Sequence, residues 1–194
     1  MESHVAGILL AAGAGSRLGQ PKATVEIGGE PLARRGVALL RAGGAQPIVL
    51  VTGAIAVDLP GVLIVHNPSW RSGMGSSLTA GLATVPDSCG AAVVALVDQP
   101  LVGPEAVRRL IAAYRAGARV VVAAYDGRPR NPVLLAREHW PEVTALAVGD
   151  AGARPFLRAH PELVTTVECG DTGRPDDVDT RADLERITDL AGQD

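Results

Sequence analysis

The sequence predicts an α/β protein, built as a three-layer α/β/α sandwich around a mainly parallel sheet. Short apolar runs recur along the chain, and segments with a helical period separate them. The runs are continuous rather than alternating, which is typical of strands buried between helices on both faces of a sheet. Strands that alternate with helices form right-handed parallel units, and this pattern favours the three-layer arrangement.

The elements follow in order from these patterns. Helical stripes of apolar residues begin at Leu32 and at Val107, and glycines end both stripes. Prolines punctuate the second half, where a late strand is expected at residues 163–169 and a closing helix at residues 180–191. The buried strands are predicted at residues 5–11, 48–52, 62–66, 91–97 and 119–124.

The length and composition limit the class of protein. Residues 1–194 are expected to form one domain with a substantial core. A net charge of −3 predicts no general attraction to nucleic acid or to an anionic membrane. The apolar start is too short to span a bilayer and has no clear signal-peptide cleavage pattern. Cys89 and Cys169 lack metal-ligand spacing, so the sequence favours a reduced, cytoplasmic protein.

A glycine-rich loop follows the first strand, in the stretch GILLAAGAGSRLGQPK. A dinucleotide-binding fingerprint needs a glycine where Leu18 stands, and a P-loop needs Ser or Thr after the lysine, where Ala23 follows Lys22. The small residues at 11–15 allow backbone N–H groups to approach an anion closely, and Arg17 and Lys22 suit a polyphosphate. The alternative is a glycine-rich turn with two solvated charges.

Other polar clusters carry the remaining candidate residues. Asp98 directly follows a buried strand, where a carboxylate can face a ligand crevice and bind Mg²⁺, or can serve as a turn residue. Asp179 precedes the closing helix and can be a second metal ligand, although Thr180 and Asp183 also fit a capping box there. The serine pair at residues 76–77 can cap a helix or hydrogen-bond the edge of a base.

Together these motifs carry a family resemblance. LAAGAGSRLGQPK resembles the LAAGxGxRMGxxK signature of nucleotidyltransferases, which implies a Rossmann-like fold of the glycosyltransferase-A type. The segments NPSWRSGMGSSLTAGL, VDQPLV, GDAGARPFL and DVDTRADL are similar to those of molybdenum cofactor cytidylyltransferases, the MocA-like branch of the MobA-like group. The resemblance extends from about Val5 to Leu190.

The resemblance implies a role for each matching residue. Asp98 and Asp179 would bind Mg²⁺, while Arg17 and Lys22 would contact the phosphates and act with Asp98 in catalysis. Ser77 would contact the base. The nucleotide would be held, in addition to Lys22, by Leu10, Ala11, Ala12, Gly13, Ala14 and Gly15. The LAAG form of the motif resembles that of enzymes that use CTP, whereas guanylyl-transferring relatives usually show LAGG. Ala12, the third residue of the motif, therefore favours CTP.

The implied reaction transfers CMP from CTP to the terminal phosphate of molybdopterin and releases pyrophosphate, with a molybdenum hydroxylase as recipient of the product. The sequence departs from the family pattern at Leu18, at Arg181 and at Asn131, which replaces the histidine of G-HPV in a segment expected near the acceptor. The alternatives are nucleotidyl transfer from CTP or GTP to a sugar or polyol phosphate, and a non-catalytic factor that binds and delivers the cofactor.

Overall fold

A mixed sheet forms the centre of the protein, and the computed structural model describes it within residues 4–192. Those residues contain one seven-stranded sheet with the order β5-β4-β1-β6-β8-β7-β9. All neighbours are parallel except those of β8, which runs antiparallel to β6 and β7, so the predicted mainly parallel sheet is confirmed. The strands are β1 His4–Ala11, β4 Ile48–Thr52, β5 Leu63–His66, β6 Cys89–Leu96, β7 Val120–Tyr125, β8 Arg128–Ala136 and β9 Val164–Glu168.

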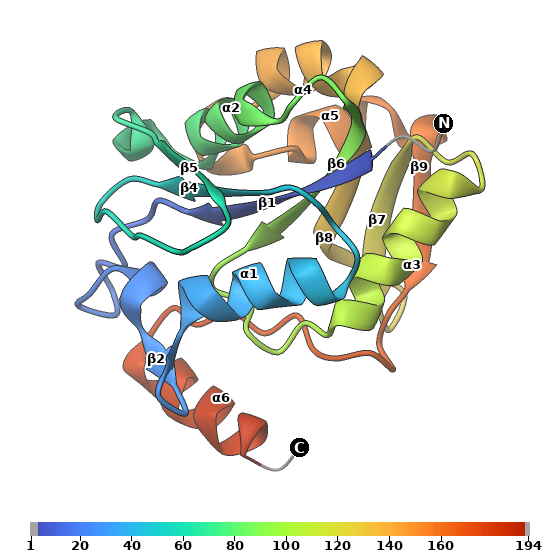
Figure 1. Cartoon of the computed structure of the whole chain (residues 1–194). Helices are drawn as coiled ribbons and strands as arrows, with labels where there is room; N and C mark the ends of the chain where they lie inside the picture. The colour runs from blue at the N-terminus through green and yellow to red at the C-terminus, as the bar shows by residue number, and fades with distance from the viewer. Residues whose placement is uncertain (1–3, 193–194) are drawn as a thin grey trace.

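Helices cover both faces of this sheet (Figure 1). The first face carries α1 Leu32–Ala42 and α3 Pro104–Arg115. The other face carries α2 Met74–Thr84, α4 Trp140–Leu146 and α5 Arg154–Ala159. The closing helix α6 Arg181–Ala191 lies beside a small ribbon, β2 Glu26–Ile27 with β3 Glu30–Pro31, at the lower end of the view. The three-layer sandwich expected from the sequence is therefore confirmed.

Successive residues of the central strand β1 supply both halves of the core. Leu9 belongs to the cluster under α1, and Ile8 belongs to the cluster under α2, because side chains alternate along a strand. A β-carbon placed on Gly36 of α1 would come within 2.6 Å of Leu9, and one on Gly81 of α2 within 2.8 Å of Ile8. These glycines therefore let both helices pack close to the sheet.

No helix within residues 4–192 is long and apolar enough to cross a bilayer.

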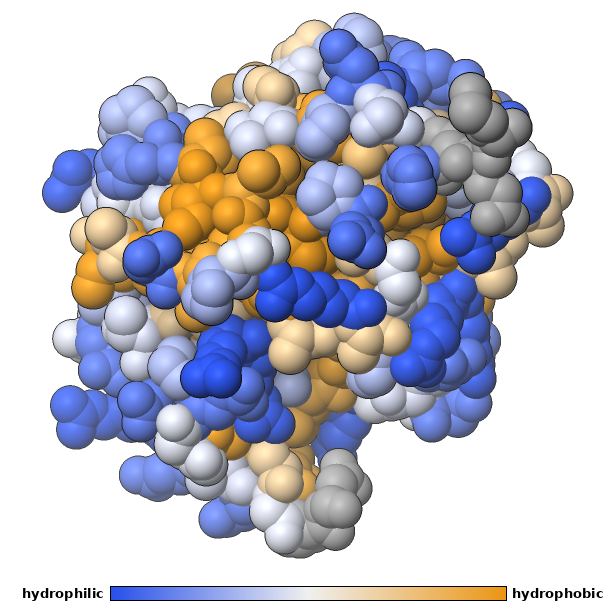
Figure 2. Space-filling view, viewed as in Figure 1, coloured by the Kyte–Doolittle hydropathy of each residue, from blue (hydrophilic) through white to orange (hydrophobic). Residues whose placement is uncertain are grey.

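The strand predicted at residues 62–66 lies at the edge of the sheet rather than inside it. The apolar run at residues 62–66 was expected to be buried, but β5 is an edge strand whose Leu63 and Ile64 are 40% and 41% exposed. Figure 2 shows hydrophobic surface over β5 and β4, between α2 and α1. Hydrophobicity alone does not distinguish an edge strand from a central one, because both can be apolar.

Another strand, β8, was not predicted. Pro129 and Pro132 lie within it, and proline is unfavourable in a central strand because it donates no ladder hydrogen bond. The structure accommodates both because β6 pairs only with residues 133–136, beyond the two prolines. The register against β7 also shifts between Val122 and Ala123, so that the second proline lies in an irregularity of the ladder.

Candidate functional site

The loop after β1 opens at the carboxyl edge of the sheet, where ligands bind in open α/β folds. Gly15 has a φ of 61°, and a β-carbon there would collide with the carbonyl of Gln20. The N–H groups of Leu18 and Gly19 donate to the carbonyl of Gly15 at 2.9 and 2.8 Å. The loop is therefore folded back on itself, and it directs Lys22 toward the end of β6.

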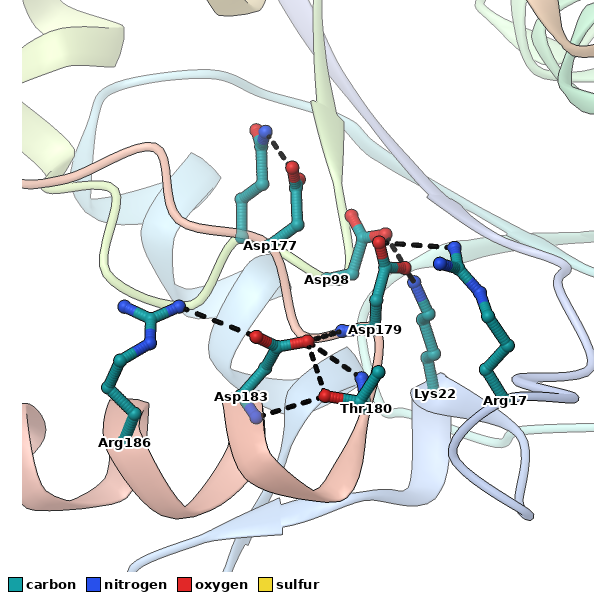
Figure 3. A network of polar contacts seen from close by, with 9 residues as sticks. Arg17, Lys22, Asp98, Asp177, Asp179, Thr180, Asp183 and Arg186 are labelled. Atoms are coloured by element: carbon teal, nitrogen blue, oxygen red, sulfur yellow. Dashed lines mark hydrogen bonds and ion pairs between the residues drawn. The ribbon is translucent and has the colours of Figure 1, made fainter.

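A cluster of four charged side chains, the edge cluster, lies beside this loop (Figure 3). The ammonium of Lys22 donates to Asp98 Oδ2 at 2.7 Å and to Asp179 Oδ1 at 2.6 Å. Arg17 Nη2 lies 3.2 Å from Asp179 Oδ2. The side chain of Lys22 is only 16% exposed, whereas that of Arg17 is 71% exposed. The structure thus brings together the residues that the sequence analysis assigned to phosphates and to metal.

The backbone around the two carboxylates is held in place by hydrogen bonds. Asp98 lies two residues after the end of β6, and its carbonyl accepts from the N–H of Val178 at 2.8 Å. At the start of α6, Thr180 and Asp183 form the capping box that the sequence predicted. The carboxylate of Asp183 also accepts from the N–H of Asp179 at 3.2 Å. The cap therefore holds the Asp179 backbone in the orientation that turns its side chain toward Lys22 and Arg17.

The charges of the edge cluster stabilise one another. The hydrogen bond from Lys22, with the further charge of Arg17, lowers the pKa of Asp179 below its ordinary value. Burial by itself would lower the pKa of Lys22, but the two carboxylates outweigh burial and raise it. Burial and the nearby charges of Asp98 and Asp179 raise the pKa of Asp177, whose carboxylate accepts from Gln99 at 2.9 Å. The edge cluster therefore pairs two basic side chains with two carboxylates.

The two carboxylates that contact Lys22 form a suitable partial site for a hard divalent cation. Their oxygens converge on one ammonium nitrogen, so both can reach a single positive charge. Within residues 4–192 no group of three or more His, Cys, Asp or Glu side chains could hold a metal alone. Mg²⁺ is commonly bound by one or two carboxylates, with substrate phosphates and water as its other ligands. Asp98 and Asp179 therefore fit a metal that arrives with a phosphate ligand.

Only part of the predicted nucleotide-binding loop faces the solvent. Leu10, Ala11 and Ala12 are 8%, 2% and 7% exposed, and they form the buried end of β1 and the residue after it. Gly13 is exposed, and Ala14 and Gly15 are half-buried. A β-carbon on Gly13 would meet no atom, so the backbone is open to approach there. A nucleotide can contact the loop through residues 13–15. The buried residues 10–12 anchor the start of the loop to the sheet.

Ser77 lies in α2, which packs on the other face of the sheet from α1 and α3. It is 3% exposed, and its hydroxyl accepts from Asn67 Nδ2 at 3.0 Å. The expectation that a serine caps this helix was wrong: α2 begins at Met74 after Gly73, and the N–H of Met74 donates to Asp150 Oδ1 at 3.4 Å. Ser76 lies in the first turn instead, where its hydroxyl donates to the Gly73 carbonyl. Contact of Ser77 with a base stays a prediction.

Comparisons with known proteins establish the family. Residues 7–164 match the family model of the MobA-like NTP transferase domain. The chain belongs to this family. It is 39% identical over 197 residues to the nicotine blue oxidoreductase of Paenarthrobacter nicotinovorans, across 94% of this chain and 96% of that protein. It is 30% identical over 144 residues to the molybdenum cofactor guanylyltransferase of Rhizobium johnstonii, across 71% of this chain and 68% of that protein.

Solved structures share the whole architecture of this MobA-like chain. A homologue of Mycobacterium tuberculosis Rv0371c from Mycobacterium sp. strain JC1 has a TM-score of 0.86 at 30% identity, with 100% of this chain and 99% of that chain covered. Rv0371c of M. tuberculosis H37Rv in complex with manganese has a TM-score of 0.78 at 26% identity, with 96% and 98% covered. The Rossmann-like nucleotidyltransferase fold implied by the sequence is confirmed.

Proposed function

We propose that this MobA-like protein is a Mg²⁺-dependent cytidylyltransferase that transfers CMP from CTP to the terminal phosphate of molybdopterin. The observation that carries the proposal is the edge cluster: two cations and two carboxylates converge beside an open glycine loop at the carboxyl edge of the sheet. This combination suits a triphosphate, because cations and backbone N–H groups can bind phosphates while carboxylates hold a metal. Loss of the metal and phosphate contacts would be the expected mark of a chain that keeps the fold without the activity, and these residues are all present.

The reaction needs no covalent intermediate with the protein. An oxygen of the acceptor phosphate attacks the α-phosphorus of CTP in line, and the bond from that phosphorus to the β-phosphate oxygen breaks. Pyrophosphate leaves with the electron pair of that bond. The exposed Arg17 and the ammonium of Lys22 would bind the leaving phosphates, and the backbone at residues 13–15 would orient them.

Asp98 and Asp179 would hold Mg²⁺, and the manganese complex of Rv0371c supports a divalent cation in a relative. The bound ion would offset charge on the phosphate oxygens. The ammonium of Lys22 contacts both carboxylates. For the ion to bind, this ammonium would have to leave at least one of them. The freed ammonium would then be available to bind the phosphates that accompany the metal.

The choice of nucleotide and acceptor is the finer part of the proposal. Ala12 favours CTP through its resemblance to cytidylyltransferases, and the guanylyltransferase relative supports molybdopterin as the acceptor. A base contact from Ser77 would require its hydroxyl to give up Asn67 or to accept a second partner. The product would pass to a molybdenum hydroxylase in the cytoplasm, a compartment consistent with the free cysteines Cys89 and Cys169.

Pyrophosphate release tests the proposal. CTP with Mg²⁺ and molybdopterin should support release, and Asp98→Asn should reduce the rate by at least about 100-fold, because a lost charge-stabilising contact has effects of that order. Asp87→Asn, which changes an exposed aspartate paired with Arg137, is the matched control and should leave the rate unchanged. Equal turnover with GTP would contradict the CTP assignment, and full activity of Asp98→Asn would exclude this carboxylate from the metal site.

A second candidate function is supported by the similarity to nicotine blue oxidoreductase, which extends over nearly the whole chain. An oxidoreductase acting on nicotine blue would change the oxidation state of that dye and would release no pyrophosphate. The loop does not match a dinucleotide-binding fingerprint, because Leu18 stands where the third glycine is needed. Oxidation of NADH or NADPH that depends on the dye and persists in Asp98→Asn would favour this second function over nucleotidyl transfer.

A further inference from the structure

A second polar hollow lies at the same edge of the sheet as the edge cluster. It has a volume of about 480 Å³, within the range of small-molecule sites. It opens where β7 ends at Tyr125 and where the chain leaves β9. Arginines dominate its lining: Arg128 and Arg130 come from β8, and Arg174 comes from the segment before α6. We call this hollow the hairpin pocket.

Strand pairing brings the polar groups of the hairpin pocket to one face. Tyr125 pairs with Arg128, and Ala123 pairs with Arg130, across the β7–β8 hairpin. Paired residues of antiparallel strands project to the same side, and so do alternate residues of one strand. Tyr125, Arg128 and Arg130 therefore share one face of the hairpin, the face that lines the pocket.

Several donors of the pocket have no partner among residues 4–192. Tyr125 is 5% exposed, and its enclosed hydroxyl makes no hydrogen bond in that described part of the chain. Burial raises the pKa of Tyr125, so the hydroxyl keeps its proton and can donate it. Arg174 is paired with Asp176, but the described residues provide neither Arg128 nor Arg130 with an ion pair or a side-chain hydrogen bond. An enclosed hydroxyl without a partner is costly, and a ligand that draws the Tyr125 side chain toward the pocket would satisfy it.

The acidic residues around the pocket are largely engaged elsewhere. Asp176 contacts both Arg174 and Arg186, at 3.1 and 2.7 Å. Glu168 accepts from backbone N–H groups at residues 126, 127 and 170. Asp126 is the one carboxylate of the lining without such partners in the described residues. The free donors and the surplus of guanidinium groups select for an anion with several acceptor oxygens.

We propose that the hairpin pocket binds an oxyanion, a phosphate or a carboxylate, through Arg128, Arg130 and the hydroxyl of Tyr125. The pocket is joined to the edge cluster by the segment from Arg174 to Asp179, which spans at most about 18 Å even when fully extended. An elongated acceptor that carries an oxyanion besides its reacting phosphate could therefore place that phosphate at the edge cluster and the oxyanion in the pocket, whereas molybdopterin, with one phosphate and no carboxylate, would leave the pocket to free phosphate. If the acceptor is the source of the oxyanion, the inference rests on the proposed function; a free phosphate ion is the other source.

Direct binding is tested without reference to any reaction. Inorganic phosphate is titrated at constant ionic strength into protein labelled with ¹⁵N-arginine, and the Nε–Hε signals are assigned with Arg128→Gln and Arg130→Gln. Both signals should shift and saturate with one dissociation constant, and Tyr125→Phe should weaken binding by about tenfold. Arg115, an exposed arginine in the last turn of α3, is the control and should not saturate. Shifts at Arg128 and Arg130 that match the control would overturn the proposal.

Kinetics then identify the source of the oxyanion. If the acceptor carries it, the double variant Arg128→Gln/Arg130→Gln should raise the KM for the acceptor by tenfold or more, with the KM for CTP unchanged. If free phosphate is the ligand, both KM values stay as in the unsubstituted protein while saturable phosphate binding is lost. Absence of any nucleotidyl transfer would contradict the proposed function alone, because the phosphate titration does not depend on turnover.

Discussion

Lys22 and a divalent cation should compete for the same two carboxylates, and Lys22→Met tests this directly. The substitution keeps a long apolar stem and removes the ammonium that contacts Asp98 and Asp179 at 2.7 and 2.6 Å. Without a metal, the two carboxylates then face each other with no cation between them. We expect the variant to be less stable than the unsubstituted protein when the buffer contains a chelator.

The size of this loss follows from the geometry. Hydrogen bonds to charged groups contribute about 1.5–3 kcal/mol each when buried. These side chains are 16% to 34% exposed, so solvent screening reduces the sum, and we expect a loss of about 2 kcal/mol. For a chain of this length, that loss lowers Tm by roughly 4–8 °C.

Thermal unfolding in chelator and in Mn²⁺ or Mg²⁺ is the assay. A ligand at 100 times its Kd stabilises the folded state by about 2.7 kcal/mol, enough to restore the variant. The cation should raise the Tm of Lys22→Met more than that of the unsubstituted protein, where it must first displace the ammonium. Lys22→Met/Asp98→Asn is the matched control and should lose this rescue. Equal metal stabilisation of all three proteins would refute the shared site.

Other predictions follow from the same structure. The pKa of Asp179 is lower in the folded than in the unfolded chain, so this carboxylate stabilises the fold above about pH 4, and the stabilisation is lost as the pH falls through the folded pKa. Lys22→Met should flatten that acid dependence in urea unfolding, and an unchanged profile would contradict the assigned cause. The hydroxyl of Tyr125 has no partner within residues 4–192, so Tyr125→Phe should leave the free energy of unfolding unchanged or raise it by up to about 1 kcal/mol. A decrease of more than about 1 kcal/mol in equilibrium unfolding would instead reveal a structural hydrogen bond from this hydroxyl. Gly103→Ala should destabilise by about 1–3 kcal/mol, since a β-carbon there meets the carbonyl of Thr172, and chemical denaturation with an unshifted midpoint would contradict this.

The periodic parts of the fold could be predicted from the sequence. The apolar runs of β1, β4, β6 and β7 are buried on both faces, and their continuous pattern reflects this directly. Asp98 was predicted at the carboxyl edge of the sheet because it follows an apolar strand, and the structure places it at that edge, two residues after β6. The capping box at Thr180 was also predictable, because its residues are three positions apart in the sequence.

The pairing of β8 could not be predicted, because it depends on distant parts of the chain. The prolines of β8 indicate a loop locally, and only the limited pairing with β6 shows why they are tolerated. Its arginines likewise gain significance only when the hairpin pocket brings them beside Tyr125.

The partners of Lys22 were not predictable for a similar reason. They lie 76 and 157 positions away, and no local pattern encodes that contact. The sequence assigned Lys22 to phosphates, and the structure shows that its ammonium also neutralises the two proposed metal ligands. The phosphate role stays a prediction.

Transfer of label from radioactive CTP is the most direct test of nucleotidyl transfer at the edge cluster. With Mg²⁺ and molybdopterin, CTP labelled at the α-phosphate should pass its label to the acceptor, and CTP labelled at the γ-phosphate should pass its label to pyrophosphate. Asp98→Asn should slow both by at least about 100-fold, whereas Asp87→Asn should change neither. The absence of α-label from every acceptor offered, with CTP and with GTP, would contradict nucleotidyl transfer at the edge cluster.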